Sequence, residues 1–390
     1  MTTDHRTQPS TTAGTPAALT TPARVTVIGA YGHTGRFVVA ELRRRGLVPI
    51  LSGRDPQRLA KMGESYPDLE TRPATVDDPD SLDRALAGAA AVINCAGPFA
   101  STAAPVIDAA LRAGVPYLDV TAETEVVLDT IAAYGDRARE AGGLVVPAVA
   151  FYGGLGDLLA TAAVGDWKTV DGDGDGDGDG HGHGDGHEHG AGHAAAAADR
   201  ISIAYALSDW RPTDGTRVTG QVSSGRRSGG RILYADGRLQ SRSGDAPRAD
   251  WTFPDPIGTQ PVVGEFTMAD SATIPTHLSV PDIDTCMTAS AVEDLRSADT
   301  SGPVAVDDSG RSAQTFLVEV VATRDGETRR AVASGQDIYA VTAPLVVEAT
   351  CRVLADPHRP SGVVTAGALA DARDFLSALS PGHLTLDFTN

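Results

Sequence analysis

Residues 25–35 read VTVIGAYGHTG, a short β-branched run followed at once by glycines at every third position. Gly29 permits a tight turn after the strand, Gly32 lets the backbone approach a bound pyrophosphate, and Gly35 allows a helix to pack closely against the strand. The helix that follows offers free N–H groups and the positive end of its dipole to an anion. This stretch predicts a dinucleotide-binding turn; the alternative is a tight turn with a purely structural role.

The sequence after this turn alternates between short apolar runs and stretches of helical length. Helices between near-continuous apolar strands indicate βαβ units and a parallel sheet covered on both faces. The predicted strands are residues 25–28, 48–51, 74–76, 91–93, 117–120 and 144–146, and the predicted helices include 34–45, 79–87, 102–113 and 123–140. Glycines 46, 88, 114 and 142 stand where helices should end. The predicted fold class is α/β: an N-terminal Rossmann doubly wound parallel sheet with a second, α+β mixed-sheet domain.

The composition changes after the sixth predicted strand. Residues 171–193 hold Asp-Gly repeats and then five histidines among glycines, a tract that cannot build a core. Further on, Asp325-Gly326 between two alternating runs predicts a β-hairpin. The predicted organisation is a disordered tail over 1–23, a Rossmann domain over 24–165, a disordered insertion over 171–193, a substrate domain over 200–335 and a helical return to the Rossmann domain over 336–390.

The charge of the chain limits its partners. Its 390 residues include 51 acidic and 32 basic ones, but seven of the acidic residues lie in 171–193, which leaves 44 outside that tract. An acidic surface argues against nucleic acid or an anionic membrane as partner. The three cysteines form no CxxC pair, and neither a signal-like segment nor an apolar run of membrane-span length stands out, so we expect a cytoplasmic protein. The expected partners are a small-molecule substrate and, as an open alternative, a second copy of the chain.

Lysine is almost absent, with Lys61 and Lys168 as the only two. Neither lies four positions after a tyrosine, so the Tyr-x-x-x-Lys pair of the short-chain dehydrogenases is missing. The other basic residues are arginines. Arg226, Arg227 and Arg231 stand among glycines and serines of the second domain, where they would either clamp a substrate carboxylate or remain exposed.

The end of the second predicted strand bears on the choice between NAD and NADP. An NAD site usually has an acid there for the ribose 2′-hydroxyl, whereas an NADP site has a cation for the 2′-phosphate. Ser52 and Arg54 stand in this place, and Arg36 follows the glycine turn, so NADP is favoured. Asp55 lies beside them and could be the acid of an NAD site, so NAD stays an alternative cofactor.

Ligands of doubly wound sheets lie outside the carboxyl ends of the strands. At the end of the fourth predicted strand, Asn94, Ala96 and Gly97 are small or turn-forming and would let the cofactor pass. The complete predicted cofactor set is Gly29, Tyr31, Gly32, His33, Thr34, Gly35, Ser52, Arg54, Asn94, Ala96 and Gly97.

Glu123 and Tyr152 are the predicted catalytic residues, since each follows a strand end at the expected crevice. The alternatives are that Glu123 is a glutamate favoured by the dipole of its own helix and that Tyr152 only lines a pocket. We interpret Cys95 as a small buried residue and His277 as a loop histidine. No metal site is predicted, because the histidine tract lacks the spacing of a defined zinc site.

Taken together, these motifs resemble the saccharopine dehydrogenase-like oxidoreductases, a family that includes the trans-acting enoyl reductases. The resemblance is carried by residues 29–36, 52–54, 93–99, 117–123, 273–277 and 335–339. It implies an N-terminal Rossmann domain, a mixed-sheet substrate domain, a helical return and a nicotinamide cofactor. Two departures are Tyr31, where the family usually has threonine, and residues 151–157, which match loosely beside the expected substrate pocket.

We therefore predict an NAD(P)-dependent oxidoreductase that transfers a hydride from NADPH to a carbonyl, imine or enoyl substrate. One alternative is a trans-acting enoyl reductase whose lipid or polyketide thioester arrives on a carrier protein. The other is a catalytically silent NADP-binding regulator, which the missing Tyr-x-x-x-Lys pair keeps open.

Overall fold

The first sheet consists of parallel strands, as the alternating pattern predicts, in a computed structural model that describes residues 22–168 and 197–389. Seven strands lie in the order β15-β6-β5-β4-β1-β2-β3, and every pairing between neighbours is parallel. They are β1 (Arg24–Ile28), β2 (Val48–Gly53), β3 (Thr71–Pro73), β4 (Ala91–Asn94), β5 (Tyr117–Asp119), β6 (Leu144–Val146) and β15 (Gly362–Val363). The order reverses between β1 and β4, which is the switch point of a doubly wound sheet.

The helices between these strands begin and end where local signals place them. They are α1 (His33–Arg44), α2 (Pro56–Ser65), α3 (Pro79–Leu86), α4 (Phe99–Ala113) and α5 (Thr124–Glu140). Asp55 and Asp78 cap α2 and α3 by accepting backbone N–H bonds, and a proline follows each cap. The glycines at 46, 88, 114 and 142 all adopt positive φ, which confirms the predicted helix ends. In contrast, β3 lies directly before the predicted run 74–76 rather than on it.

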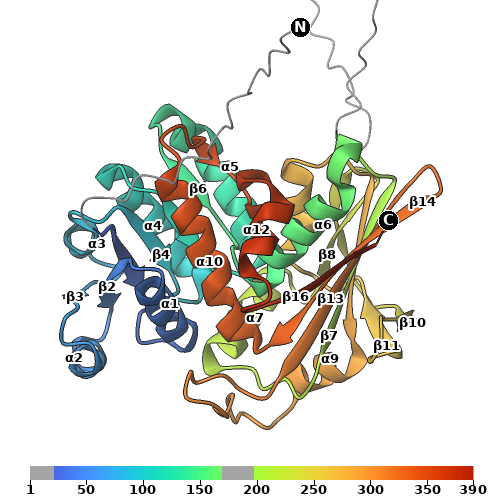
Figure 1. Cartoon of the computed structure of the whole chain (residues 1–390), viewed down its shortest axis with the longest axis horizontal. Helices are drawn as coiled ribbons and strands as arrows, with labels where there is room; N and C mark the ends of the chain where they lie inside the picture. The colour runs from blue at the N-terminus through green and yellow to red at the C-terminus, as the bar shows by residue number, and fades with distance from the viewer. Residues whose placement is uncertain (1–21, 169–196, 390) are drawn as a thin grey trace, which may run out of the picture.

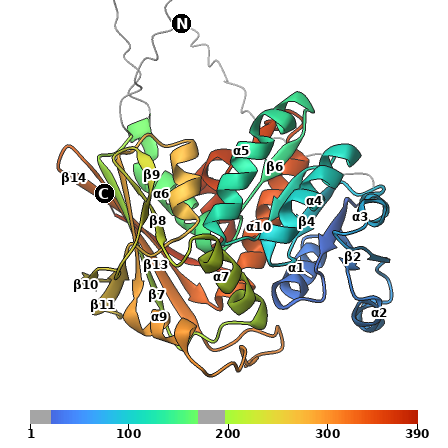
Figure 2. The same cartoon turned by 180° about the vertical axis from the view of Figure 1, so that it is seen from behind.

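Two hydrophobic cores cover the two faces of this sheet, because successive strand residues point to opposite sides. On one face, Val27 and Ile93 pack in a cluster that includes residues of α1. On the other face, Val92 and Tyr117 pack with residues of α3 and α4. Figure 1 shows α1 in front of the sheet, and Figure 2, from behind, shows α4 and α5.

The second sheet is mixed, as predicted. It has nine strands, and its main order is β10-β11-β12-β7-β13-β14-β16, with β8 and β9 attached at β12. The strands are β7 (Arg200–Leu207), β8 (Arg231–Ala235), β9 (Arg238–Arg242), β10 (Arg248–Thr252), β11 (Thr259–Gly264), β12 (Asp282–Thr288), β13 (Thr315–Arg324), β14 (Glu327–Gln336) and β16 (Thr385–Thr389). The predicted hairpin is confirmed, since Arg324 pairs with Glu327 across a two-residue loop in which Asp325 and Gly326 have φ of 51° and 81°.

Shorter elements join and cover the two sheets. They are η1 (Phe151–Leu155), α6 (Gly156–Val164), η2 (Gly165–Lys168), α7 (Asp214–Arg226), α8 (Asp270–Thr273), η3 (Ile274–Thr276) and α9 (Ala289–Arg296). Helix α7 lies between the second sheet and the helices of the first domain (Figure 2).

The C-terminal segment ties the two sheets together. It comprises α10 (Ile338–Ala355), β15, α11 (Ala366–Leu369), α12 (Ala372–Leu379) and β16, so it adds a strand to each sheet as well as the expected helices. Helix α10 packs against α1, and Arg45 of the first domain forms an ion pair with the buried Glu348. Within the described residues, α10 is long and apolar enough to cross a membrane, but 72% of it is buried inside the protein. It is therefore a core helix of this fold.

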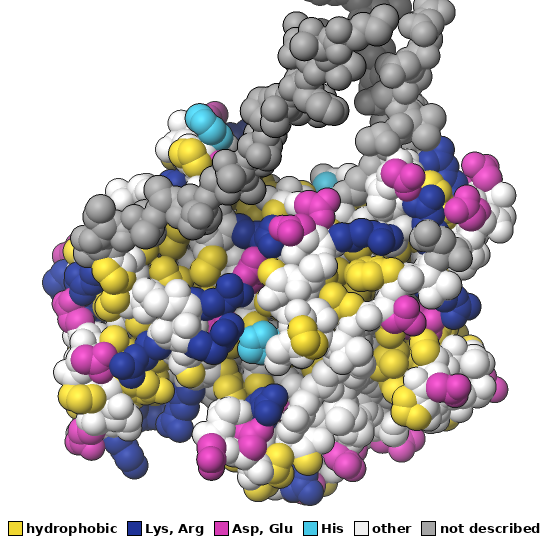
Figure 3. All heavy atoms as spheres, in the orientation of Figure 1, with side chains coloured by type: hydrophobic (Ala, Val, Ile, Leu, Met, Phe, Trp, Pro, Cys, Tyr) yellow, Lys and Arg dark blue, Asp and Glu magenta, His cyan; other side chains and the backbone are white. Residues whose placement is uncertain are grey.

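The predicted insertion over 171–193 and nearly all of the predicted tail over 1–23 lie outside the described residues. On the face in Figure 3, arginine and acidic side chains are interspersed. Many charged side chains of the described residues form ion pairs, such as Arg352 with Asp374 at 2.8 Å.

Candidate functional site

A cavity of about 810 Å³ opens at the carboxyl ends of the parallel strands, beside the switch point. Its walls come from the glycine turn, the ends of β2, β3 and β4, the residues after β6, the first turns of α7 and the start of α10. Its volume falls within the range of small-molecule and cofactor sites. The cavity thus lies where ligands of doubly wound sheets bind and extends from the first domain to the second.

The glycine turn leaves room for an anion. Gly29 has φ of +82°, and a Cβ there would lie 3.0 Å from the backbone of Cys95 and Ala96. A Cβ at Gly35 would overlap the carbonyl oxygen of Gly29. Gly32 caps α1 without any side-chain hydrogen bond, so the first N–H groups of the helix stay open toward the cavity. These observations fit a pyrophosphate.

Arginines stand at the cavity end beside β2, where the adenosine ribose of a dinucleotide would lie. Arg54 and Arg58 both line this end, and the Arg58 guanidinium lies over the Tyr31 ring, 4.7 Å from its centroid. Asp55 points elsewhere, because its carboxylate accepts the backbone N–H bonds of Gln57 and Arg58 at the start of α2. The acid that kept NAD open is therefore engaged as a helix cap, and the cations fit a 2′-phosphate.

Two residues of the predicted phosphate clamp lie outside the cavity wall. Ser52 is fully buried in β2, and its carbonyl oxygen accepts the N–H groups of Gly29 and Ala30. Arg36 is exposed and donates to the Tyr31 carbonyl oxygen at 3.3 Å. Ser52 thus anchors the turn through its backbone, and of the three predicted residues only Arg54 faces the cavity.

Some residues of the loop after β4 line the cavity, and others hold the loop in place. Ala96 and Gly97 line the cavity, as predicted. Asn94 is buried below them, where its Oδ1 accepts from the Ala96 N–H at 3.0 Å and its Nδ2 donates to the Thr102 and Tyr117 hydroxyls. Asn94 therefore holds the shape of the loop without reaching the cavity.

Glu123 is placed away from the cavity wall. Its Oε1 accepts the N–H of Phe99 at 2.6 Å and its Oε2 that of Ala100 at 3.2 Å, so it caps the neighbouring helix α4. Burial raises the pKa of this carboxyl, while the two backbone bonds lower it. Both oxygens are engaged at a helix N-terminus, which gives Glu123 a structural position rather than the predicted place beside a substrate.

Tyr152 lies at the opposite end of the cavity from Arg54. Its ring is packed among Phe151, Tyr205 and Trp210, with centroids 4.8–6.1 Å away. Its hydroxyl is buried and has no hydrogen-bond partner in the described part of the chain. Burial raises the pKa of Tyr152 well above its ordinary value, so the hydroxyl stays protonated and available as a donor.

His33 lies in the cavity wall between the two ends. Phe37 and Tyr339 contact its ring edge-to-face at 5.4 and 5.1 Å. Its Nε2 is buried without a hydrogen-bond partner among the described residues. Burial lowers the pKa of His33, which favours the neutral ring.

Residues 25–146 match the family model described as the saccharopine dehydrogenase NADP binding domain. This part of the chain is therefore similar to the NADP-binding domain of saccharopine dehydrogenases. A "probable mitochondrial saccharopine dehydrogenase-like oxidoreductase" from Arabidopsis thaliana is 36% identical over 140 residues, which cover 32% of this chain and 31% of that protein. A trans-acting enoyl reductase from Mycobacterium ulcerans is 28% identical over 133 residues, 33% of this chain and 32% of the relative. The resemblance seen in the motifs is confirmed over this domain, and the matches span about a third of the curated relatives.

The fold extends this likeness beyond the NADP-binding domain. Apo saccharopine dehydrogenase (L-Glu forming) from Saccharomyces cerevisiae superposes with a TM-score of 0.61, covering 94% of this chain and all of that chain. The two sequences are 12% identical, so this comparison shows a shared architecture. The predicted α/β fold with a second mixed sheet is confirmed.

Four features of the cavity wall were not predicted as parts of the site from the sequence: Arg58, Trp210, Tyr339 and the first turns of α7. Tyr339 lies in the motif at 335–339, and its hydroxyl contacts Thr213 and Thr216 of α7 and the Trp210 indole. Arg58 carries a local signal, since it lies one helical turn after Arg54 in a helix that Asp55-Pro56 begins. The residues of α7 carry none, because only the tertiary fold brings them to the NADP-binding domain.

The other residues considered as candidate functional groups in the sequence either lie apart from the cavity or are unreactive. Burial raises the pKa of the Cys95 thiol, so this wall residue is no thiolate nucleophile. His277 contacts Asp157 at 3.3 Å and the Thr161 hydroxyl at 2.9 Å, away from the cavity wall. The described residues hold no group of three or more His, Cys, Asp or Glu placed for a metal, and the histidine tract lies outside them.

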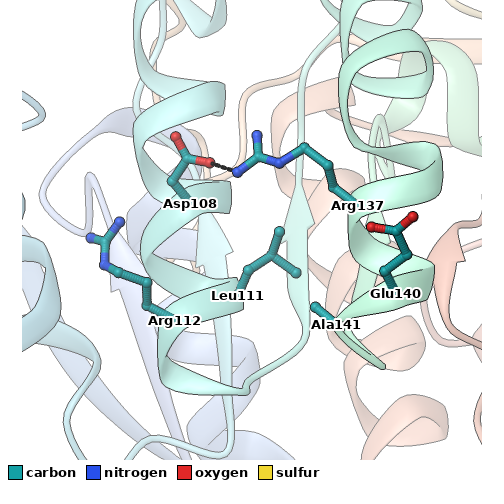
Figure 4. Close-up of a pocket in the computed structure, with 6 residues that line it drawn as sticks. All are labelled: Asp108, Leu111, Arg112, Arg137, Glu140 and Ala141. Carbon is teal, nitrogen blue, oxygen red and sulfur yellow. Dashed lines mark hydrogen bonds and ion pairs between the residues drawn. The ribbon is translucent and has the colours of Figure 1, made fainter.

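A second hollow lies at the opposite edge of the NADP-binding domain. It is formed by the last turns of α4 and α5, and the ion pair between Asp108 and Arg137 crosses it at 2.9 Å (Figure 4). These helix ends lead into the amino ends of β5 and β6. The hollow is therefore separate from the ligand-binding edge of the sheet.

Asp270 gives a pH-dependent prediction. This carboxyl is fully buried, accepts the Tyr205 hydroxyl at 2.9 Å, and has a pKa raised by burial to about 6. An unfolded aspartic acid ionises near pH 4, so between about pH 4 and 6 the unfolded state releases a proton that the folded state keeps, and stability falls as pH rises. We expect Asp270→Asn to gain about 3 kcal/mol relative to the unmodified protein between pH 4 and 7, measured by urea unfolding.

Asp245→Asn, in the exposed loop between β9 and β10, is the control for this series. It should show no comparable pH-dependent difference. A constant offset between the Asp270→Asn variant and the unmodified protein across this pH range would contradict the raised pKa.

Proposed function

We propose that the chain is an NADPH-dependent reductase that transfers a hydride to a carbonyl, imine or enoyl carbon. One observation carries the proposal: a single cavity is lined by the open glycine turn, by Arg54 and Arg58, and by Tyr152, whose buried hydroxyl has no hydrogen-bond partner among the described residues. The family of residues 25–146 supports the cofactor. The oxidoreductase relatives support the reaction class.

The chain offers groups that would hold the pyrophosphate and the 2′-phosphate of this cofactor. The N–H groups at the start of α1 would hold the pyrophosphate, and Arg54 and Arg58 would hold the 2′-phosphate. Ala96 and Gly97, which line the cavity after β4, are small residues and leave space for the cofactor to extend toward Tyr152. The bound cofactor supplies the hydride, which is the difficult part of the reaction.

Tyr152 completes the reaction as proton donor. A reduced carbonyl oxygen or enolate carbon must receive a proton, and a positioned donor contributes about 10²–10⁴-fold in rate. The Tyr152 hydroxyl meets this need because burial keeps it protonated and no other group holds it among the described residues. Phe151 and Trp210 pack against its ring.

The arginine clamp predicts how cofactor preference changes. Arg54→Ala or Arg58→Ala should weaken NADPH binding by about 10–100-fold and leave NADH binding nearly unchanged, because only NADPH carries the 2′-phosphate. Fluorescence titration with both nucleotides measures this. Arg139→Ala, which removes an exposed arginine paired with Asp136 on α5, is the matched control. Equal losses for the two nucleotides would contradict the clamp.

The proposal as a whole is tested by turnover. Purified protein with NADPH should consume the nucleotide in the presence of carbonyl, imine or enoyl compounds, followed by absorbance. Nucleotide binding without consumption over a broad panel would favour the catalytically silent regulator instead.

The Mycobacterium ulcerans relative favours enoyl substrates as a second candidate, with a thioester on a carrier protein. Faster turnover of carrier-bound than of free enoyl thioesters would support that candidate. A cytoplasmic location and a homodimer remain part of this proposal.

A further inference from the structure

The two ends of the cavity differ in charge. Among the described residues that line it, the only Lys or Arg side chains are Arg54 and Arg58, both at the nucleotide end. Phe151 and Trp210 pack against the Tyr152 ring, and the wall also includes Val218, Ile338 and hydroxyl groups of the second domain. The end where a substrate would react is therefore aromatic, apolar and free of cations in the described part of the chain.

The arginines near this end are held by other groups. Arg227 pairs with Glu125 at 2.6 Å, Arg226 with Asp129 at 2.6 Å, and Arg231 with Glu265 at 2.8 Å. None of the three lines the cavity, so the predicted carboxylate clamp does not form there. Arg217 lies on α7 itself, but its terminal nitrogens donate to the carbonyl oxygens of residues 297 and 299.

The start of α7 offers no anion site in place of an arginine. Its cap is made by the Thr213 hydroxyl, which accepts the Thr216 N–H at 3.1 Å, while the Thr213 N–H donates to the Tyr339 hydroxyl. Asp214 stands in the first turn and lines the cavity. The positive end of this helix dipole thus already faces a carboxylate, and a second anion would be repelled.

We propose that the reducible substrate carries no ionised carboxylate where it meets Tyr152, and is a neutral carbonyl or enone with an apolar or aromatic flank. A carboxylate placed there would lose its hydrating water without gaining a cation, which is unfavourable. This inference rests on the proposed reductase function and narrows its substrate class. It separates the chain from amino-acid and keto-acid chemistry.

The reaction balances with the groups named. For a ketone, the carbonyl carbon gains a hydride with oxidation of NADPH to NADP⁺, and the oxygen gains the Tyr152 proton. The product is an alcohol, and Tyr152 regains its proton from water. For an enone, the β-carbon gains the hydride and the α-carbon gains the proton, which gives the saturated ketone.

Matched pairs of neutral and carboxylate-bearing probes test whether the site rejects an ionised carboxylate near Tyr152. Phenylacetone and phenylpyruvate differ only by a methyl group or a carboxylate on the ketone carbon, and benzylideneacetone and benzylidenepyruvate are the corresponding enones. We expect kcat/KM with NADPH to favour the neutral member of at least one pair by about 100-fold, since a buried charge without a partner is strongly unfavourable. Equal or faster turnover of the acids would overturn the inference.

A cation added to the wall should shift this preference. Val218 lines the cavity, is 45% exposed and so tolerates a longer side chain. Val218→Arg should raise kcat/KM for the keto acids at least about 10-fold over Val218→Met, which adds similar length without charge. No difference between the two variants would count against the assigned position of the substrate.

Nucleotide binding separates the failure of this inference from the failure of the proposed function. If NADPH does not bind, the reductase proposal itself is wrong. If NADPH binds and neither member of a pair is reduced, calorimetry of the probes with the NADPH complex decides. Tighter binding of the neutral member supports the inference, whereas tighter binding of the acid, or no binding of either probe, overturns it.

Discussion

Gly35→Ala should weaken NADPH binding by about 100-fold or more while leaving the protein folded. The added Cβ would overlap the carbonyl oxygen of Gly29 and come within 3.0 Å of that of Ala30. The turn must then move away from α1, and the first N–H groups of the helix lose the pyrophosphate. Nucleotide fluorescence measures the loss, and circular dichroism reports whether the fold is kept.

A second variant keeps the test informative if Gly35→Ala does not fold. Gly32 lines the cavity, and a Cβ there comes no closer than 3.0 Å to the Gly29 oxygen. Gly32→Val should therefore fold and still block the space of the pyrophosphate. Gly225→Ala is the matched control, because it lies in α7 with no atom within 4 Å of the added Cβ. Normal NADPH binding by both turn variants would show that the glycine turn has only a structural role.

Tyr152→Phe should lower kcat by about 10²–10⁴-fold with little change in NADPH affinity. The substitution removes only the hydroxyl, which has no hydrogen-bond partner among the described residues, so packing against Phe151 and Trp210 is kept. Single-turnover reduction of benzylideneacetone or phenylacetone measures the effect.

Tyr134→Phe is the control for the tyrosine variant, since the Tyr134 hydroxyl donates to the Ala104 carbonyl oxygen away from the cavity. It should retain the full kcat. Because burial raises the pKa of Tyr152 well above its ordinary value, the unmodified protein should show no loss of kcat from this group up to about pH 9. An unchanged kcat in Tyr152→Phe would mean that the proton comes from elsewhere.

The first domain could be predicted because its signals are local. The strand and helix periods, the glycine turn and the helix stops each depend on neighbours within one turn or one strand. The two-residue strand β15 and the edge strand β16 carry no such signal. They form because α10 returns to the first domain and the chain then passes both sheets.

The candidate site could be predicted only in part, for the same physical reason. Ala96 and Gly97 reach the cavity through the end of their own strand. Glu123 follows a strand end as well, but the free N-terminus of α4 lies close enough to take both carboxylate oxygens. Trp210 and Tyr339 reach the cavity through contacts between residues more than a hundred positions apart, which no local pattern encodes.

Titration of the full chain with NADPH and with NADH tests whether the cavity is a dinucleotide site with a 2′-phosphate clamp. Trp210 lines the cavity, so energy transfer from tryptophan to a bound nicotinamide reports occupancy. We expect NADPH to bind at least about 10-fold more tightly than NADH, because Arg54 and Arg58 meet the 2′-phosphate while Asp55 is engaged as a helix cap. Equal affinity for the two nucleotides would contradict the assigned 2′-phosphate clamp, and no binding of either would show that the cavity is not a dinucleotide site.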